Sequence, residues 1–221
     1  EREGKEGGEG MSKNSTLIHN TVVLTAITLV AGAVLGGVHF ITAGPIEAQK
    51  KATADAAMKS VFADASSFEA VEWDAKDPAF AQTLLDAGLD QTNVYSVSKA
   101  LDGSGNVVGY VVDAGNNEGY GGEVEVMVGV GTDETGMTVT GISFLNLEET
   151  AGMGSKADEP AFKDQFKGIA LGDETAIKYV KSGKSAANEI DAISGCTITT
   201  NATTKAVNGA LCAVNTIKEE D

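Results

Sequence analysis

The chain has 221 residues, enough for one sizeable domain and one further element. Its 32 acidic and 16 basic residues give a formal net charge of −16 at pH 7, which argues against nucleic acid and against an anionic lipid surface as the main partner. Two cysteines and two histidines are present, without a C-x-x-C or C-x-x-C-H motif, so neither a metal site nor a Ser-His-Asp triad is predicted.

The N-terminal residues are charged and rich in glycine, and Met11-Ser12-Lys13 is typical of a natural start. Such a composition contains too few apolar side chains to form a core. We interpret residues 1–12 as a disordered or cloning-derived N-terminal extension.

A long apolar run follows. No charged residue occurs between Lys13 and Glu47, and Leu17–Ile41 is mostly apolar. This length is sufficient to cross a bilayer as one helix, so residues 13–43 are predicted to be a transmembrane anchor. A cleaved secretory signal is the competing interpretation, because residues 41–44 are rich in small side chains, but the apolar run exceeds a usual signal core. Lysines flank both sides, so the positive-inside rule does not fix the orientation.

Residues 44–89 are predicted to form a helical stalk and a helical subdomain. Pro45 is expected to open a helix that continues to about Phe62. A second helix is expected to start at Asp77–Pro78, with Asp77 as its N-cap, and to end at Gly88.

Residues 90–221 are predicted to form one α+β domain. Its strands are expected in four segments with β-branched or alternating apolar residues: 94–99, 107–112, 124–130 and 136–145. Residues 102–106 and 132–136 supply turn residues between them. The valines at alternate positions from Val124 to Val130 predict a half-buried strand.

A glycine-containing loop, Asn146–Ser155, follows the last of these strands. Gly152 and Gly154 allow the backbone to approach a flat ring, and Met153 offers a soft apolar contact. The pair Glu149–Thr150 offers polar groups for ring edges. The alternative is an ordinary glycine turn without a ligand.

A hydroxyl-rich turn, Asp191–Thr200, precedes a helical pattern near the end of the sequence. Apolar residues recur there at intervals of three and four positions: Ala202, Ala206, Val207, Ala210, Leu211, Val214 and Ile217. Thr197, Thr199 and Thr200 therefore lie at or near a helix N-terminus, where unpaired N–H groups and the helix dipole favour a phosphate. The phosphate can be held non-covalently or esterified to a hydroxyl. The alternative is that Ser194 or a threonine only caps the helix.

The segment Asp191-x-x-Ser194-Gly195-Cys196-Thr197-x-Thr199 resembles the flavinylation motif D-x-x-[ST]-G-A-T-x-[ST] of FMN-binding-domain proteins. This family contains the G subunit of the Rnf complex and the C subunit of the Na⁺-pumping NADH:quinone oxidoreductase. Cys196 stands where the family usually has alanine.

Two further segments carry the resemblance. Residues 146–155 resemble the family's E-T-P-G-L-G loop, with Ala151 in place of proline and Met153 in place of leucine. Residues 119–145 resemble the hairpin that leads into this loop. The three segments occur in the family's order, and the resemblance covers roughly residues 90–218.

The resemblance implies covalent FMN. In the family, the FMN phosphate is joined to the motif threonine by a phosphoester bond, which a separate flavin transferase forms with FAD as donor. Thr197 would carry the flavin, and the transferase would recognise Asp191, Ser194, Gly195 and Thr197. The residues expected around the cofactor are Ser194, Gly195, Cys196, Thr197, Thr199 and Thr200 of the turn, and Glu149, Thr150, Gly152, Met153, Gly154 and Ser155 of the loop.

The resemblance also implies an electron-transfer component of an Rnf-type ion-translocating ferredoxin:NAD⁺ oxidoreductase, with an extracytoplasmic FMN-binding domain and no substrate turnover of its own. Its partners would be the other subunits of the complex. The G subunit fits better than the C subunit, because the sequence ends within one helix of the motif. A non-catalytic, membrane-anchored assembly or binding module is the alternative from a different class.

Overall fold

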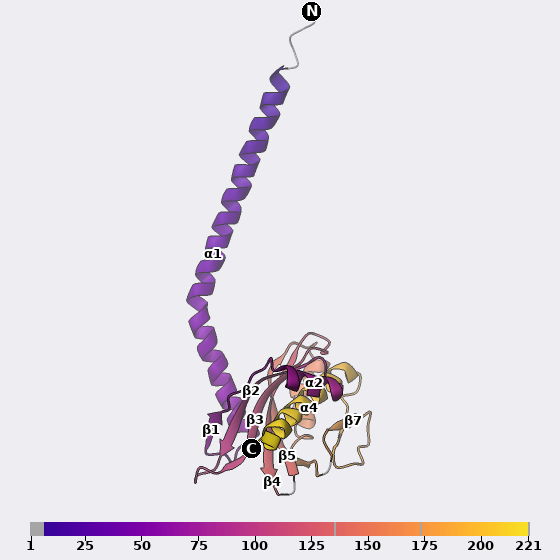
Figure 1. The fold of residues 1–221 in the computed structure, drawn as a ribbon. Coiled ribbons are helices and arrows are strands. Elements are labelled where there is room, and N and C mark those ends of the chain that lie inside the picture. Colours follow the sequence, from indigo (N-terminus) through magenta and orange to yellow (C-terminus); the bar gives the residue numbers. More distant parts are fainter. Residues whose placement is uncertain (1–6, 135, 173, 221) are drawn as a thin grey trace, which may run out of the picture. The chain divides into compact units, whose positions relative to one another are not determined.

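The computed structural model describes residues 7–134, 136–172 and 174–220 (Figure 1). The chain divides into two compact units, Glu1–Ala52 and Thr53–Asp221. Residues 1–6, which belong to the predicted N-terminal extension, lie outside the described residues.

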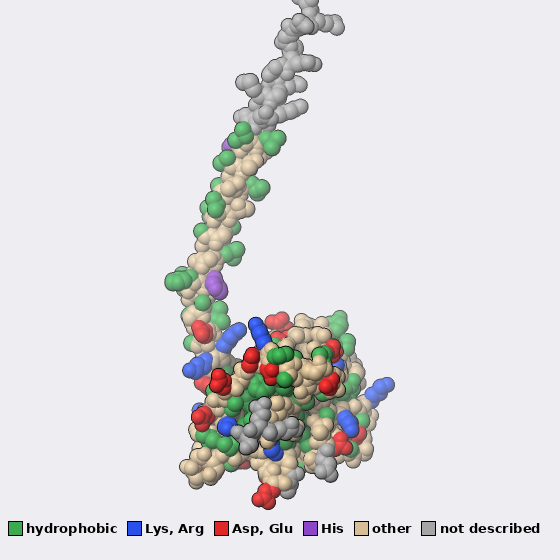
Figure 2. Space-filling view, in the orientation of Figure 1, with side chains coloured by type: hydrophobic (Ala, Val, Ile, Leu, Met, Phe, Trp, Pro, Cys, Tyr) green, Lys and Arg blue, Asp and Glu red, His purple; other side chains and the backbone are tan. Residues whose placement is uncertain are grey.

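Helix α1 (Gly7–Val61) begins in the first unit and ends in the second. From Thr16 onward it is long and apolar enough to cross a membrane, and its most apolar window, with a mean hydropathy of 2.2, buries none of its side chains. Figure 2 shows hydrophobic side chains exposed along this helix. Apolar side chains are costly to expose to water and are favourable in lipid, so the helix fits a single-pass membrane anchor.

Pro45 lies inside α1, so the prediction that it opens a separate helix is wrong. Proline has no backbone N–H, and the carbonyl of Ile41, four residues earlier, therefore loses its intrahelical donor. The alanine- and lysine-rich sequence that follows strongly favours helix. The helix therefore continues through this local defect.

Six strands form one antiparallel sheet in which neighbours in the sequence are neighbours in space. They are β1 (Ser67–Ala70), β2 (Thr92–Leu101), β3 (Val107–Asn116), β4 (Val124–Asp133), β5 (Gly136–Leu147) and β6 (Ile169–Ala170). The four long strands contain the four segments that the sequence predicts, and the α+β class is confirmed. A separate parallel pair consists of β7 (Lys178–Val180) and β8 (Glu189–Asp191).

The helices of the second unit are α2 (Pro78–Asp86), the short 3₁₀ helix η1 (Gly154–Asp158), α3 (Pro160–Lys163) and α4 (Thr197–Glu220). Asp77 caps α2, because its carboxylate accepts a hydrogen bond from the Ala79 N–H at 3.0 Å. Gly88, with φ of +72°, follows the end of the same helix. Both predicted boundaries of α2 are therefore confirmed.

Helix α4 packs across β2, β3 and β4 on one face of the sheet (Figure 1). The side chains that meet in this core are fully buried: Val124, Val126, Val128 and Val130 from β4, and Ala202, Ala206, Val207, Ala210, Leu211 and Val214 from α4. Burial of this apolar surface is the main force that positions α4 on the sheet.

The end of α1 covers part of the other face. Ala57, Val61 and Phe62 form a second apolar cluster with Val111 and Met127. The sequence predicts a half-buried β4, but Met127 is 1% exposed because this helical segment lies over it. The sheet is therefore buried on both faces at its centre.

Candidate functional site

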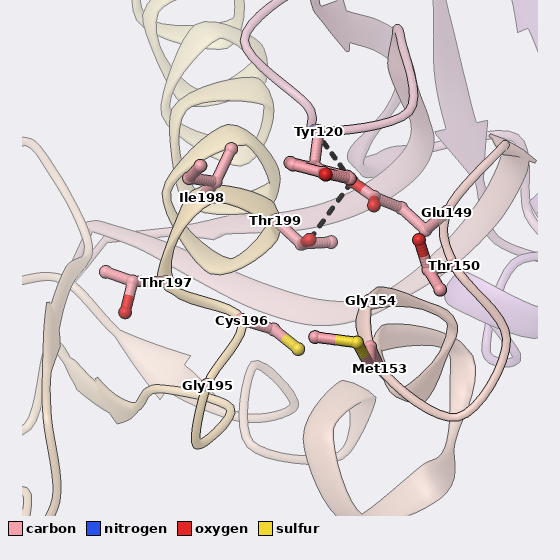
Figure 3. Close-up of a pocket in the computed structure, with 10 residues that line it drawn as sticks. All are labelled: Tyr120, Glu149, Thr150, Met153, Gly154, Gly195, Cys196, Thr197, Ile198 and Thr199. Atoms are coloured by element: carbon pink, nitrogen blue, oxygen red, sulfur yellow. Dashed lines mark hydrogen bonds between the residues drawn. The ribbon is translucent and has the colours of Figure 1, made fainter.

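A cavity of about 480 Å³ lies at the N-terminus of α4 (Figure 3). Its walls come from the connection between β3 and β4, the loop after β5 and the first residues of α4. The lining residues are Tyr120, Glu149, Thr150, Met153, Gly154, Gly195, Cys196, Thr197, Ile198 and Thr199. The structure thus brings together the two motifs that the sequence predicts around a cofactor.

The turn before α4 depends on a glycine and on Thr200. Gly195 has φ of +79°, a left-handed conformation that other residues rarely adopt. The Thr200 hydroxyl donates to the Cys196 carbonyl at 3.0 Å and accepts from the Ile193 N–H at 3.1 Å. Thr200 therefore fastens the turn to the helix, and it lies behind the cavity wall rather than in it.

The three motif threonines differ in accessibility. Thr199 and Thr200 are 2% and 0% exposed, and their hydroxyls are hydrogen-bonded. Thr197, the first residue of α4, is exposed and lines the cavity. The first N–H groups of a helix have no partner within the helix and form its positive end. Thr197 is therefore the accessible threonine hydroxyl where a phosphate is electrostatically favoured.

Glu149 joins the three walls of the cavity. Its Oε1 atom accepts hydrogen bonds from the Thr199 hydroxyl and from the Tyr120 N–H, both at 3.0 Å (Figure 3). Hydrogen bonds to a carboxylate are among the stronger ones in proteins. Glu149 therefore fixes the β3–β4 connection and the loop after β5 relative to the start of α4.

The glycines of the loop have different roles. Gly152 has φ of +76°, which favours glycine, while nothing lies within 4 Å of a Cβ placed there. A Cβ on Gly154 would lie 2.6 Å from Glu149 Oε2 and 2.8 Å from Thr199 Oγ1. Gly154 therefore makes room for the Glu149–Thr199 contact. Ser155 holds the turn, because its hydroxyl accepts from the Gly152 N–H at 2.9 Å.

Asp191 and Ser194 lie outside the cavity lining. The Asp191 carboxylate accepts from the Lys184 N–H at 3.0 Å, and the Gln165 side chain binds both the N–H and the carbonyl of Asp191. Ser194 is exposed beside Gly195. Asp191 therefore orders the segment between β7 and β8, next to the motif turn.

Tyr120 and Ile198 line the cavity but are not among the residues that the sequence analysis expects around the cofactor. Figure 3 shows them opposite Cys196 and Met153 in that view. The signal for Tyr120 was its place between glycines in Gly119-Tyr120-Gly121, an exposed aromatic in a tight connection. For Ile198 the signal was an apolar residue between two motif threonines.

The residues present fit the FMN that the sequence resemblance implies. An exposed hydroxyl at a helix N-terminus suits the phosphate, and Tyr120, Met153, Cys196 and Ile198 offer apolar and aromatic contacts for a flat ring. The volume lies within the range of small-molecule sites, roughly 300–1,000 Å³. In the described ranges, no group of three His, Cys, Asp or Glu side chains is arranged to hold a metal ion.

Comparison with known proteins agrees with this site. The FMN-binding domain family matches residues 119–212, which include all the cavity-lining residues. The chain is 35% identical to the G subunit of the Na⁺-translocating ferredoxin:NAD⁺ oxidoreductase complex of Acetobacterium woodii, over 85% of this chain and 86% of that protein. It is 29% identical to the G subunit of the ion-translocating oxidoreductase complex of Methanosarcina acetivorans, over 91% of this chain and 96% of that protein.

A shorter similarity extends to a second group of proteins. The chain is 33% identical to the C subunit of the Na⁺-translocating NADH-quinone reductase of Vibrio anguillarum, over 58% of this chain and 52% of that protein. Similarity to the G subunits therefore covers more of both proteins than similarity to this C subunit.

Proposed function

Because the chain belongs to the family of the G subunits of Rnf-type ion-translocating oxidoreductase complexes, we propose that it holds FMN covalently, through a phosphoester bond to Thr197. Membership of this family makes the chain an electron-carrying component of a multi-subunit oxidoreductase. The family membership therefore favours an electron-carrying role over that of a non-catalytic assembly module. The longer coverage favours a G subunit over a C subunit.

The observation that carries the proposal is that Thr197, the first residue of α4, is exposed and lines a cavity whose walls include several apolar side chains. Bound there, FMN would supply the electron-transfer chemistry. The first turn of α4 would hold the phosphate with its N–H groups. Tyr120, Met153 and Ile198 would contact the ring and exclude water from it. Glu149 would hold the walls of the cavity in fixed relative positions, because its carboxylate binds both the β3–β4 connection and the first turn of α4.

Attachment requires a second protein, a flavin transferase that uses FAD. The reaction forms one bond, from Thr197 Oγ1 to the flavin-side phosphorus of FAD, and breaks the pyrophosphate bond, so that AMP and the hydroxyl proton leave. We propose that Asp191 and the adjoining Ser194-Gly195 turn are recognised in this step. Ser194 and Gly195 are exposed and Asp191 is partly exposed, which supports this role because a transferase must approach from the solvent side.

The proposal is tested by expressing the chain with a flavin transferase and measuring its intact mass and its fluorescence after denaturation. The wild type should keep the flavin, whereas Thr197→Ala should lose it and Thr197→Ser should retain it. Thr216→Val is the matched control, because Thr216 lies on the same helix but outside the cavity lining. Flavin fluorescence on denatured Thr197→Ala would contradict the attachment site.

The same assay separates recognition by Asp191 from folding. Asp191→Asn keeps a carbonyl acceptor for the Lys184 N–H and should preserve the local structure. If the transferase reads the charge, this variant should load slowly, while its circular dichroism stays unchanged. Wild-type loading kinetics would remove Asp191 from the recognition step.

A further inference from the structure

The connection between β7 and β8, residues 181–188, carries two exposed lysines, Lys181 and Lys184. Within the described part of the chain neither lysine forms an ion pair, whereas Lys178 of β7 pairs with Glu174 at 3.3 Å. The chain as a whole has a formal net charge of −16, so unpaired positive groups stand out from their surroundings. A locally positive segment of this kind favours an anionic ligand.

Parallel pairing places this connection next to the motif turn. Strands β7 and β8 run in the same direction and end together. The Ala192 N–H, just after β8, donates to the Val180 carbonyl at 2.8 Å, and Val180 directly precedes Lys181. The next residue after Ala192 is Ile193, whose N–H is bound to the Thr200 hydroxyl of α4. The chain therefore leaves β7 at Lys181 beside the point where it turns into α4.

Contacts with α4 lead to the same position. Strand β7 contacts α4, and the Asn208 side chain accepts from the Ile177 N–H at 2.8 Å and donates to the Ile177 carbonyl at 2.9 Å. The strand from Ile177 to Lys181 rises about 13 Å. Helix α4 rises about 16 Å between Thr197 and Asn208. The strand is therefore long enough to bring Lys181 near the level of Thr197.

Two carboxylates hold the connection through its backbone. The Asp191 carboxylate accepts from the Lys184 N–H at 3.0 Å. The Glu189 carboxylate accepts from the N–H groups of Ser185 and Ala186 at 2.8 and 3.1 Å. Hydrogen bonds to an ionised group are among the stronger ones in proteins. The connection is therefore ordered by its backbone, and its exposed lysine side chains are left for a ligand.

We propose that Lys181 and Lys184 bind the diphosphate of FAD while the flavin transferase attaches FMN to Thr197. The inference rests on the proposed function. In that step the bond from Thr197 Oγ1 to the flavin-side phosphorus forms and the hydroxyl proton leaves. The pyrophosphate bond breaks, and its electron pair stays on the departing AMP, whose phosphate gains negative charge. Ammonium groups on flexible four-carbon stems suit a phosphate that moves during the reaction.

The test follows loading of the full-length apo chain in detergent by intact mass, with purified transferase and varied FAD. Lys181→Gln/Lys184→Gln should lower kcat/KM for FAD by roughly tenfold, because charged hydrogen bonds to the donor are lost. Lys181→Arg/Lys184→Arg should load at the wild-type rate, because it keeps both charges. Lys178→Gln is the matched control and should also load at the wild-type rate, since Lys178 lies at the opposite end of β7 and pairs with Glu174.

The inference is overturned if Lys181→Gln/Lys184→Gln has the wild-type kcat/KM for FAD. It is also overturned if this variant binds FAD-free transferase more weakly than the wild type in calorimetry, because the lysines would then contact the transferase and not the donor. A wild-type chain that takes up no flavin would contradict the proposed function, and this inference would fall with it. Both lysines are exposed, so unchanged circular dichroism is expected for every variant.

Discussion

Asp113 is an acidic residue of β3 in a setting that disfavours its charge. Its Oδ1 atom is buried without a hydrogen-bond partner in the described part of the chain. Burial, and then the neighbouring Glu125 and Glu123 carboxylates, raise the pKa of Asp113 to about 7. The side chain is therefore protonated in the folded protein at mildly acidic pH, where the unfolded chain would be ionised.

This gives a signed pH dependence. Between about pH 4 and about pH 7 the folded state binds more protons at Asp113 than the unfolded state, so the free energy of unfolding falls as pH rises and levels off above the window. Asp113→Asn should remove this slope, and its gain in stability over the wild type should grow with pH to about 4 kcal/mol at the top of the window. The free energy of unfolding at each pH can be measured by urea unfolding in detergent, followed by the fluorescence of Trp73.

Asp102→Asn is a control of opposite sign. The Asn106 side chain and backbone N–H groups lower the pKa of Asp102, so its contribution to stability is lost as pH falls through that pKa.

The Asp113 prediction is contradicted if the free energy of unfolding depends on pH in the same way in the wild type and in Asp113→Asn. That result would mean that Asp113 stays ionised in the folded state.

At the scale of elements, periodicity predicts the long pieces of this fold and misses the short ones. The alternation in β4 and the three- and four-residue spacing in α4 identify both, because each buries one face. Strands β6, β7 and β8 have two or three residues, and such segments carry no period of their own. Their pairing depends on partners that only the folded chain supplies.

The candidate site divides in the same way. Glu149, Met153, Cys196 and Thr197 belong to contiguous motifs, so the sequence alone points to them. Tyr120 reaches the cavity because Glu149 and α4 hold its connection in place, which is a tertiary relation. The Gly119-Tyr120-Gly121 sequence indicates a tight connection, but it does not indicate which part of the fold that connection contacts.

Gly129 of β4 tests how closely the end of α1 approaches the sheet. A Cβ there would collide with the Thr140 side chain and would lie 3.0 Å from the Val61 carbonyl carbon, while Thr140 also donates a hydrogen bond to the Val61 carbonyl. Gly129→Ala should therefore destabilise the second unit by about 1–3 kcal/mol, the usual cost of overpacking. Urea unfolding measures this loss.

Gly131→Ala is the matched control in the same strand. The nearest atom to its Cβ would be Thr140 Cγ2 at 3.4 Å, an ordinary contact. If both substitutions lowered the free energy of unfolding equally, the backbone at Val61 would be free to move away from the sheet. That result would contradict the close packing at Gly129.

At the scale of the whole molecule, the acidic composition and the apolar helix divide the chain into two environments. Figure 2 shows acidic side chains over the second unit, where they are solvated, and hydrophobic ones along α1. We propose that Leu17–Ile41 is the membrane span and that the second unit lies outside the cytoplasm. The family membership supports a membrane complex. The lysines on both ends of the apolar segment do not determine on which side of the membrane the second unit lies.

Topology can be read by labelling intact cells with a membrane-impermeant thiol reagent, in a background with Cys196→Ala and Cys212→Ala. Lys51→Cys should react before the cells are broken, because Lys51 is exposed beyond the apolar segment. Ser12→Cys, on the other side of that segment, should react only afterwards. The reverse pattern would place the second unit in the cytoplasm.

The burial of α4 has a consequence for how long the cofactor stays with the protein. Thr197, the proposed attachment residue, is the first residue of α4, whose inner face is buried against the sheet from Ala202 to Val214. Amide protons along this face should exchange with solvent only when the whole unit opens, so the anchor point has the same kinetic persistence as the fold. On the proposed function, flavin is lost neither by dissociation nor by fraying of its helix. The half-life of the cofactor then equals the half-life of the polypeptide, and replacing one requires synthesis of the other.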